Sequence, residues 1–311
     1  MTPVATRMDE SAHGVYVISV TPFTDDGAVD WGSLESLVEF YVGCGVHGIT
    51  LLGMMGEAHK LSSDESVQLV ERAIQQVAGR VPVVAGVSAG GIAPLRSLAL
   101  TAIDAGAAAV MVAPPAGLRT DDQILGYYRQ VAAALGPDVP FIYQDYPQST
   151  GVHLSASLFA RLAEALPSLV MLKLEDCPGL DKLTRIRADA VAAGRRRVSI
   201  LAGNGGLYFP QFLRRGADGA MTGFAYPDVL VQVYERFAAG DAEGADDIYD
   251  RFLPLIAHEQ QPGFGLALRK EMLRRRGAIA CAAARQPGPA LTDADRTELD
   301  HLLARAEQRR P

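Results

Sequence analysis

The sequence predicts an α/β fold, a TIM (β/α)8 barrel with a C-terminal helical extension. Short apolar runs alternate with helix patterns eight times along the first 240 residues, with glycine-rich joints between them. The runs are continuous rather than alternating, as expected for parallel strands that are covered on both faces. An open doubly wound sheet usually carries a Gly-x-Gly-x-x-Gly turn after its first strand, and this chain has none there. A closed eight-fold barrel explains the count directly.

The predicted strands are apolar runs that end at glycine, proline or polar residues. They cover residues 15–20, 48–52, 81–87, 108–112, 139–143, 169–174, 198–202 and 219–221. The helix patterns that follow them cover residues 33–43, 63–77, 94–104, 121–135, 155–165, 180–192, 207–214 and 227–237. Ser33 is an expected N-cap of the first helix, Ser63 with Glu65 opens the second, and Gly106 is an expected C-cap of the third.

The strand pattern stops after Gly240, and the rest of the chain has helical periodicity only. Three helices are expected, at residues 242–256, 265–276 and 292–307, with a Gln-Pro-Gly-Pro connector before the last. We therefore expect two units: a barrel over residues 1–240 and a three-helix extension over residues 241–311 that packs on it.

The composition points to a globular intracellular protein. Hydrophobic residues make up 49% of the chain, and a net charge of −7 with a pI near 5.4 argues against nucleic acid as a partner. The cysteines Cys44, Cys177 and Cys281 are widely spaced, as in proteins that keep their thiols reduced. No apolar segment has the length of a membrane span or the form of a signal peptide. These features predict a cytoplasmic location with no membrane contact.

Lys173 is the residue around which the functional prediction is built. It stands near the end of the apolar run at residues 169–174, and Glu175 and Asp176 follow it. Burial of an amine favours its neutral form, which is a nucleophile toward carbonyls, so Lys173 could form a Schiff base with a keto substrate. The alternative is a strand-end lysine whose ammonium group reaches water and pairs with an acid. The barrel favours the reactive role, because its strand ends share one pocket.

The other candidates stand at or near the carboxyl ends of predicted strands. They are Met54, Met55, Gly56, Tyr143, Gln144, Asp145, Glu175, Asn204 and Thr222. Glu175 lies two residues after Lys173 and should share its face of the strand, where it would either move protons or pair with a buried cation. Asn204 would contact a substrate hydroxyl or serve only as a turn residue. Tyr143 should point away from the pocket by alternation, unless the register shifts.

The sequence predicts neither a metal site nor a cofactor. The six histidines form no His-x-x-x-His pair. No Gly-x-Ser-x-Gly elbow follows a strand, which argues against a Ser-His-Asp hydrolase.

Several motifs of the chain resemble those of the dihydrodipicolinate synthase / N-acetylneuraminate lyase family. They are Gly14-Val15, Thr21-Pro22-Phe23, the loop Gly53-Met54-Met55-Gly56-Glu57, Pro147 with Thr150-Gly151, and Lys173. The family comprises class I aldolases and dehydratases on an eight-fold barrel, which are usually tetrameric. The resemblance implies that Lys173 forms the Schiff base and that backbone amides around Met54 and Met55 hold the substrate carboxylate.

The departures from the family pattern bear on the substrate. Members that make dihydrodipicolinate carry two threonines at the positions of Met54 and Met55 and a tyrosine at the position of Gln144. Their second tyrosine would fall near Ala116, and the arginine that binds a second carboxylate would fall at Ser149. The hydroxyl relay and the carboxylate clamp of those members are therefore absent from these positions.

Residues 143–147 with the Lys-Leu-Glu and His-Glu-Gln stretches are instead similar to a branch that contains 2-keto-3-deoxy sugar acid dehydratases. We expect a Schiff-base lyase, a dehydratase or aldolase, whose partner is a small 2-oxo acid. The resemblance also implies a homo-oligomer, either a tetramer or a dimer. Two alternatives remain: an inactive 2-oxo-acid binding or regulatory protein on the same barrel, and a divergent true dihydrodipicolinate synthase.

Overall fold

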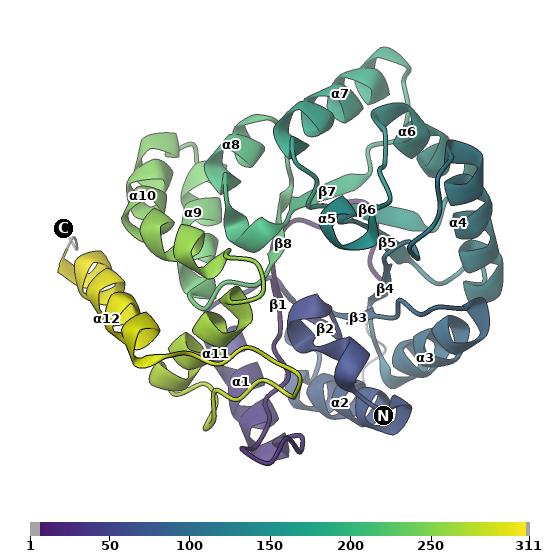
Figure 1. Ribbon diagram of the computed structural model, residues 1–311. Coiled ribbons are helices and arrows are strands. Elements are labelled where there is room, and N and C mark those ends of the chain that lie inside the picture. The colour runs from purple at the N-terminus through teal and green to yellow at the C-terminus, as the bar shows by residue number, and fades with distance from the viewer. Residues whose placement is uncertain (1–6, 309–311) are drawn as a thin grey trace.

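The computed structural model describes residues 7–308 and confirms the predicted barrel. Eight parallel strands pair in chain order, and β8 closes the sheet against β1. The strands are β1 (Gly14–Ile18), β2 (Gly48–Leu51), β3 (Val83–Gly86), β4 (Ala109–Val112), β5 (Phe141–Asp145), β6 (Leu169–Leu174), β7 (Ser199–Ala202) and β8 (Gly219–Thr222). Figure 1 looks along this barrel and shows the helices arranged around it.

The helices around the barrel follow the predicted order. They are α1 (Trp31–Gly43), α2 (Ser63–Val77), α3 (Ile92–Ala105), α4 (Asp121–Leu135), α6 (Ala156–Ala165), α7 (Gly179–Ala192), α8 (Phe209–Arg214) and α9 (Pro227–Ala238). The N-cap of α1 is Asp30, whose side chain accepts from the amide of Ser33, and not Ser33 itself. Helix α2 begins with a reciprocal capping box between Ser62 and Glu65, and α3 ends at Gly106 as predicted.

Strand alternation divides the core into two layers. One apolar cluster fills the barrel and includes Tyr16, Ile18, Ile142, Met171 and Met221. The other lies between the sheet and the surrounding helices. Each strand thus buries both faces, which explains why the strands read as continuous apolar runs.

Strand β5 lies two residues later than predicted. It begins at Phe141 and ends at Asp145, because Pro140 has no amide hydrogen to give to the ladder and precedes the first paired residue. The shift brings Gln144 into the strand, directly opposite Lys173 of β6.

Short helices that the sequence did not predict follow several strands. They are η1 (Met54–Gly56), η2 (Ala58–Lys60), α5 (Pro147–Thr150) and η3 (Asn204–Gly206). All of them lie in loops after strands β2, β5 and β7, and they shape the end of the barrel where the strands finish.

The C-terminal extension consists of α10 (Ala242–Glu259), α11 (Gly265–Arg275) and α12 (Asp293–Gln308), close to the predicted ranges. In Figure 1, α10, α11 and α12 gather on one side of the barrel. The division of the chain at residue 240 stays a prediction, and residues of α10 and α11 reach the mouth of the barrel.

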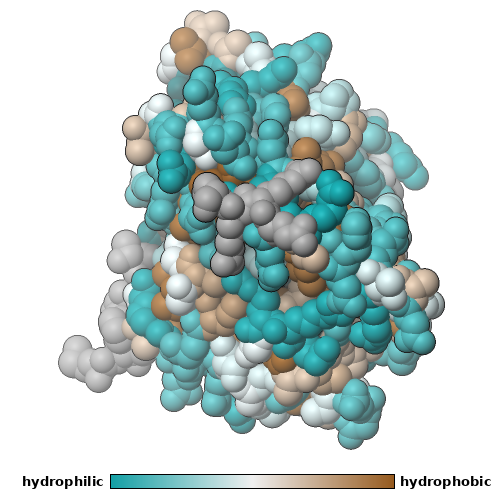
Figure 2. Space-filling model, turned by 90° about the vertical axis from the view of Figure 1, so that its left-hand side faces the viewer, coloured by the Kyte–Doolittle hydropathy of each residue, from teal (hydrophilic) through white to brown (hydrophobic). Residues whose placement is uncertain are grey.

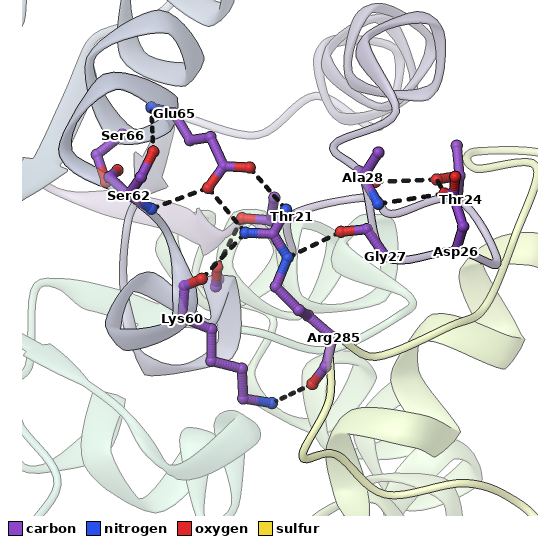
Figure 3. Close-up of polar contacts among 11 residues, drawn as sticks. Thr21, Thr24, Asp26, Gly27, Ala28, Lys60, Ser62, Glu65, Ser66 and Arg285 are labelled. Atoms are coloured by element: carbon purple, nitrogen blue, oxygen red, sulfur yellow. Dashed lines mark hydrogen bonds and ion pairs between the residues drawn. The ribbon is translucent and has the colours of Figure 1, made fainter.

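Arg285 joins the segment after α11 to the loop that follows β2 (Figure 3). Its guanidinium donates to both carboxylate oxygens of Glu65, at 2.7 and 2.8 Å, and to the carbonyl oxygens of Gly27 and Lys60. Lys60 Nζ in turn donates to the Arg285 carbonyl at 2.7 Å. Bidentate arginine–carboxylate pairs are geometrically demanding, so these bonds fix the position of the segment.

The face that carries the extension is mainly hydrophilic, with apolar side chains scattered over it (Figure 2). No helix among residues 7–308 is both long enough and apolar enough to span a membrane.

Candidate active site

A cavity of about 310 Å³ opens at the carboxyl ends of the strands. Its lining includes Ile18, Met54, Met55, Gln144, Tyr146, Lys173, Glu175, Asn204, Thr222, Gly223, Glu259, Gln260 and Arg269. The strand ends supply one wall, and the segment that joins α10 to α11 supplies the other. Six of the predicted candidates other than Lys173 are therefore brought together around it.

Lys173 lines the cavity with a side chain that is buried almost completely. Met171 faces the barrel interior, so alternation turns Lys173 inward as well. Its Nζ lies 2.9 Å from Oε2 of Glu175. The amide of Gln144 donates to the same carboxylate oxygen at 2.8 Å. An amine, a carboxylate and an amide thus meet at one oxygen inside the cavity.

The loop after β7 holds Glu175 in place. Asn204 Nδ2 donates to the Glu175 carbonyl at 2.9 Å, and Asn204 itself adopts a left-handed backbone conformation. A Cβ at Gly203 would overlap the Glu175 side chain. Glycine at this position therefore gives the carboxylate its space, and Asn204 positions the backbone that carries it.

Tyr143 and Asp145 lie on the outer face of β5, away from the cavity. Tyr143 stacks on Tyr128 of α4 with ring centroids 4.5 Å apart. Asp145 pairs with Lys182 at 2.7 Å, and burial raises its pKa to about 7 although Lys182 opposes the rise. No register shift brings either side chain inward, so the structure leaves Tyr143 and Asp145 outside the group that lines the cavity.

The loop after β2 places Met54 and Met55 at the cavity in the short helix η1. The amides of Gly56 and Glu57 bond back to Gly53 and Met54, whereas the first amides of such a turn have no acceptor inside it. Gly56 is packed beneath, close to the Ser19 carbonyl, and does not line the cavity. The arrangement could offer backbone donors to an anion at Met54 and Met55.

Sequence reasoning missed Arg269 and Tyr146. Arg269 resembles a solvent-facing helix residue in the sequence, yet its side chain is only 3% exposed. Tyr146 follows β5 directly, and burial raises the pKa of its phenol. The sequence offers two indications of them, the stretch at residues 143–147 that contains Tyr146 and the His-Glu-Gln stretch after the barrel, where a helix-end hydrogen bond is the expected role.

Among residues 7–308, no group of three or more His, Cys, Asp or Glu side chains is arranged to hold a metal ion. The side chains that line the cavity supply amine, carboxylate, amide, phenol and guanidinium groups.

Comparison with known proteins shows the family. The dihydrodipicolinate synthetase family model matches residues 11–306. The chain belongs to this family. It is 33% identical over 305 residues to an L-2-keto-3-deoxyarabonate dehydratase of Azospirillum brasilense, with 94% of each chain covered. It is 30% identical over 245 residues to a 4-hydroxy-tetrahydrodipicolinate synthase of Pseudomonas putida, with 78% of this chain and 81% of the relative covered.

The fold is also that of solved family members. A crystal structure described as dihydrodipicolinate synthase from Rhodopseudomonas palustris has a TM-score of 0.94 and 45% identity, covering 96% of this chain and 99% of its own. Family membership makes the chain an enzyme of the carbon–oxygen or carbon–carbon lyase type.

Proposed function

We propose that the chain is a Schiff-base lyase that dehydrates or cleaves a 2-keto-3-deoxy sugar acid. The observation that carries the proposal is the meeting of Lys173, Glu175 and Gln144 at one carboxylate oxygen inside the cavity. An amine that attacks a ketone needs a neighbouring group to take and return protons, and Glu175 lies within hydrogen-bond distance of it.

The reaction begins when Nζ of Lys173 attacks the keto carbon. Proton transfers through Glu175 release the keto oxygen as water and leave a protonated imine. The imine acts as an electron sink, so a base can remove a C3 proton to give an enamine. The enamine then expels the C4 hydroxyl as water with a proton from an acid. In the alternative course, a base removes the proton of the C4 hydroxyl while the imine is still intact, the C3–C4 bond breaks to release an aldehyde, and an acid protonates the resulting enamine at C3. Hydrolysis of the imine releases the product and restores Lys173.

Glu175 is the best-placed group for these transfers. Gln144 occupies the position of the family tyrosine, but its amide group is too weak an acid to transfer a proton. It orients Glu175 through a 2.8 Å hydrogen bond. Tyr146 is the competing proton donor, because its phenol also lines the cavity. The two candidates differ in their hydrogen bonds: Glu175 lies 2.9 Å from Lys173 Nζ, whereas the described residues show no hydrogen bond between the Tyr146 phenol and that amine.

The polar side chains that line the cavity favour a sugar acid over aspartate semialdehyde as the substrate. Condensation of the semialdehyde uses the hydroxyl relay and the arginine clamp, whereas their positions hold Met54, Met55, Gln144 and Ser149. Gln144, Glu175 and Asn204 offer both donors and acceptors to hydroxyl groups. The dehydratase relative supports this choice, while the 45% identical structure described as dihydrodipicolinate synthase keeps a divergent synthase as the second candidate.

The deciding assay compares two substrate sets on the same enzyme. One is pyruvate with aspartate semialdehyde, and the other is a panel of 2-keto-3-deoxy sugar acids. We expect turnover of at least one panel member and little condensation of the semialdehyde. Efficient condensation without turnover of the panel would favour the synthase instead.

Reductive trapping separates the lyase from an inactive binding protein. Incubation with pyruvate and borohydride should add one reduced pyruvate to the intact mass, and Lys173→Ala should remove the addition without loss of fold. Lack of an adduct with every 2-oxo acid tried would favour the binding protein. A homo-oligomer, measurable by light scattering, and a cytoplasmic location remain predictions.

A further inference from the structure

Arg269 brings a buried guanidinium from the C-terminal extension to the barrel mouth. Its Nε and Nη2 contact Oε1 of Glu259, the last residue of α10. The other carboxylate oxygen, Oε2, accepts from the amide of Ala225 at 3.1 Å. Both side chains of the pair are almost fully buried. The contacts fix the plane of the guanidinium and balance its charge locally.

The remaining nitrogen of Arg269, Nη1, has no hydrogen-bond partner among the described residues although it is buried. Nη1 lies against Gly223, which directly follows β8. A Cβ on residue 223 would overlap Nη1 and would lie 3.2 Å from the carbonyl oxygen of Ile18. Both Arg269 and Gly223 line the cavity. The glycine therefore leaves the space that Nη1 occupies, beside the cavity that contains Lys173.

We propose that Nη1 of Arg269 binds a hydroxyl oxygen of the substrate chain beyond the keto carbon, which makes Arg269 a specificity-determining residue. This inference rests on the proposed function. A buried donor without an acceptor is unfavourable, and a ligand oxygen that accepts from it removes that cost. Because Glu259 already balances the charge of Arg269, the free N–H suits a neutral oxygen better than a second carboxylate. A site of this kind rejects analogues that lack the oxygen.

Two variants test the inference by different routes. Arg269→Gln combined with Glu259→Gln removes both charges together, so that no uncompensated ion stays buried. Gly223→Ala keeps both charges and displaces Nη1 by its Cβ. We expect kcat/KM for a 2-keto-3-deoxy sugar acid to fall on the order of 10- to 100-fold in each, mainly through KM. Trapping of pyruvate, which has no hydroxyl group, should stay at the wild-type level at equal pyruvate concentration.

Arg274→Gln is the matched control. Arg274 is on the same helix, but its side chain is 44% exposed, does not line the cavity, and pairs with the buried Glu271, which Arg275 also contacts. It should behave as the wild type with both ligands. If the double variant fails to fold by circular dichroism, Gly223→Ala carries the test.

Three results would overturn the inference. Unchanged kcat/KM for the sugar acid in the folded variants would mean that Nη1 does not contact it. An equal loss of pyruvate trapping would mean that Arg269 serves the carboxylate common to both ligands. Absence of pyruvate trapping and of turnover in the wild type would remove the proposed function itself, and the inference with it.

Discussion

Two buried ion-pair clusters lie near the barrel mouth, and they differ in whether their hydrogen bonds are complete. In the first, Glu57 accepts from Lys60 at 2.8 Å, from Lys270 at 2.6 Å and from the amide of Arg285 at 3.0 Å. Lys270 also donates to the Ala283 carbonyl at 2.8 Å. This closed cluster ties the loop after β2 to α11 and the segment beyond it.

The second cluster is open to the cavity. Lys173 and Gln144 share one oxygen of Glu175, and the nearby Arg269 keeps one nitrogen without a partner among the described residues. Burial of charge is costly in both clusters. The closed one satisfies its groups within the protein and serves the fold, whereas the open one leaves groups for a ligand to satisfy. Completeness of hydrogen bonding, rather than burial, therefore distinguishes the closed cluster from the candidate site.

Glu175→Gln should have the largest effect on activity. The amide keeps the shape of the side chain but cannot take and return a proton, so turnover of the sugar acid should fall on the order of 10²- to 10⁴-fold. Steady-state kinetics measures the loss, with Tyr146→Phe as the comparison. A larger loss in Tyr146→Phe than in Glu175→Gln would transfer the proton-transfer role to the phenol.

Glu57→Gln should have the largest effect on stability. It leaves the buried ammonium group of Lys270 without its counter-ion and turns an amide nitrogen toward groups that donate to Glu57, and breaking a buried pair costs about 3–5 kcal/mol. Burial already lowers the pKa of Lys270 against the effect of Glu57. Urea denaturation measures the loss of unfolding free energy.

The matched control is the double variant Glu57→Gln with Lys270→Met, which removes the stranded cation. It should be clearly more stable than Glu57→Gln alone. Equal instability of the single and double variants would show that the cluster is not held by this pair.

The two clusters also differ in how much of each could be predicted from the sequence. Lys173 and Glu175 were predictable, because a cation inside an apolar strand and an acid two residues later must share the inner face of a barrel. Thr222, Asn204 and Gln144 were predictable as well, because they stand at or near the carboxyl ends of predicted strands. The eight-fold pattern gave the fold for the same reason: each strand and helix is encoded by its own local periodicity.

Arg269 could not be predicted in this way. Charged residues on a helix ordinarily mark its solvent face, whereas Arg269, Lys270 and Glu271 are consecutive and all buried. Their burial depends on partners that are distant in the sequence, such as Glu57 for Lys270. The loop glutamate Glu57 likewise belongs to a motif in the sequence, but its direction, away from the cavity, is set by the extension.

Asp145 is intermediate between the two clusters in how completely its oxygens are bonded. Its contribution to stability should therefore depend on pH. One oxygen pairs with Lys182, while Oδ1 has no partner among residues 7–308. Burial raises its pKa from an ordinary 3.8 to about 7. The folded state therefore holds a proton that the unfolded state has lost between these values, so the stability due to this group is complete below about pH 4 and is lost as the pH rises through about 7.

Asp145→Asn removes this titration. The unfolding free energy of the variant minus that of the wild type should rise with pH between about 4 and 7, by at most about 1.4 kcal/mol per pH unit. Denaturation series at several pH values give the difference, in which the other titrating groups cancel. A constant or falling difference would show that Asp145 is ionised in the folded protein throughout this range.

Ser62→Ala should have the smallest effect, because it changes the exposed border of the closed cluster. The Ser62 hydroxyl accepts from the amide of Glu65 at 3.1 Å, and the Glu65 carboxylate accepts from the Ser62 amide at 2.8 Å. Loss of such an N-cap costs about 1 kcal/mol. Glu65 keeps its bidentate pair with Arg285, so the segment after α11 should stay in place. Urea denaturation should show the small loss, and turnover should be unchanged because Ser62 does not line the cavity. A loss as large as that of Glu57→Gln would mean that the capping box is part of the closed cluster rather than its border.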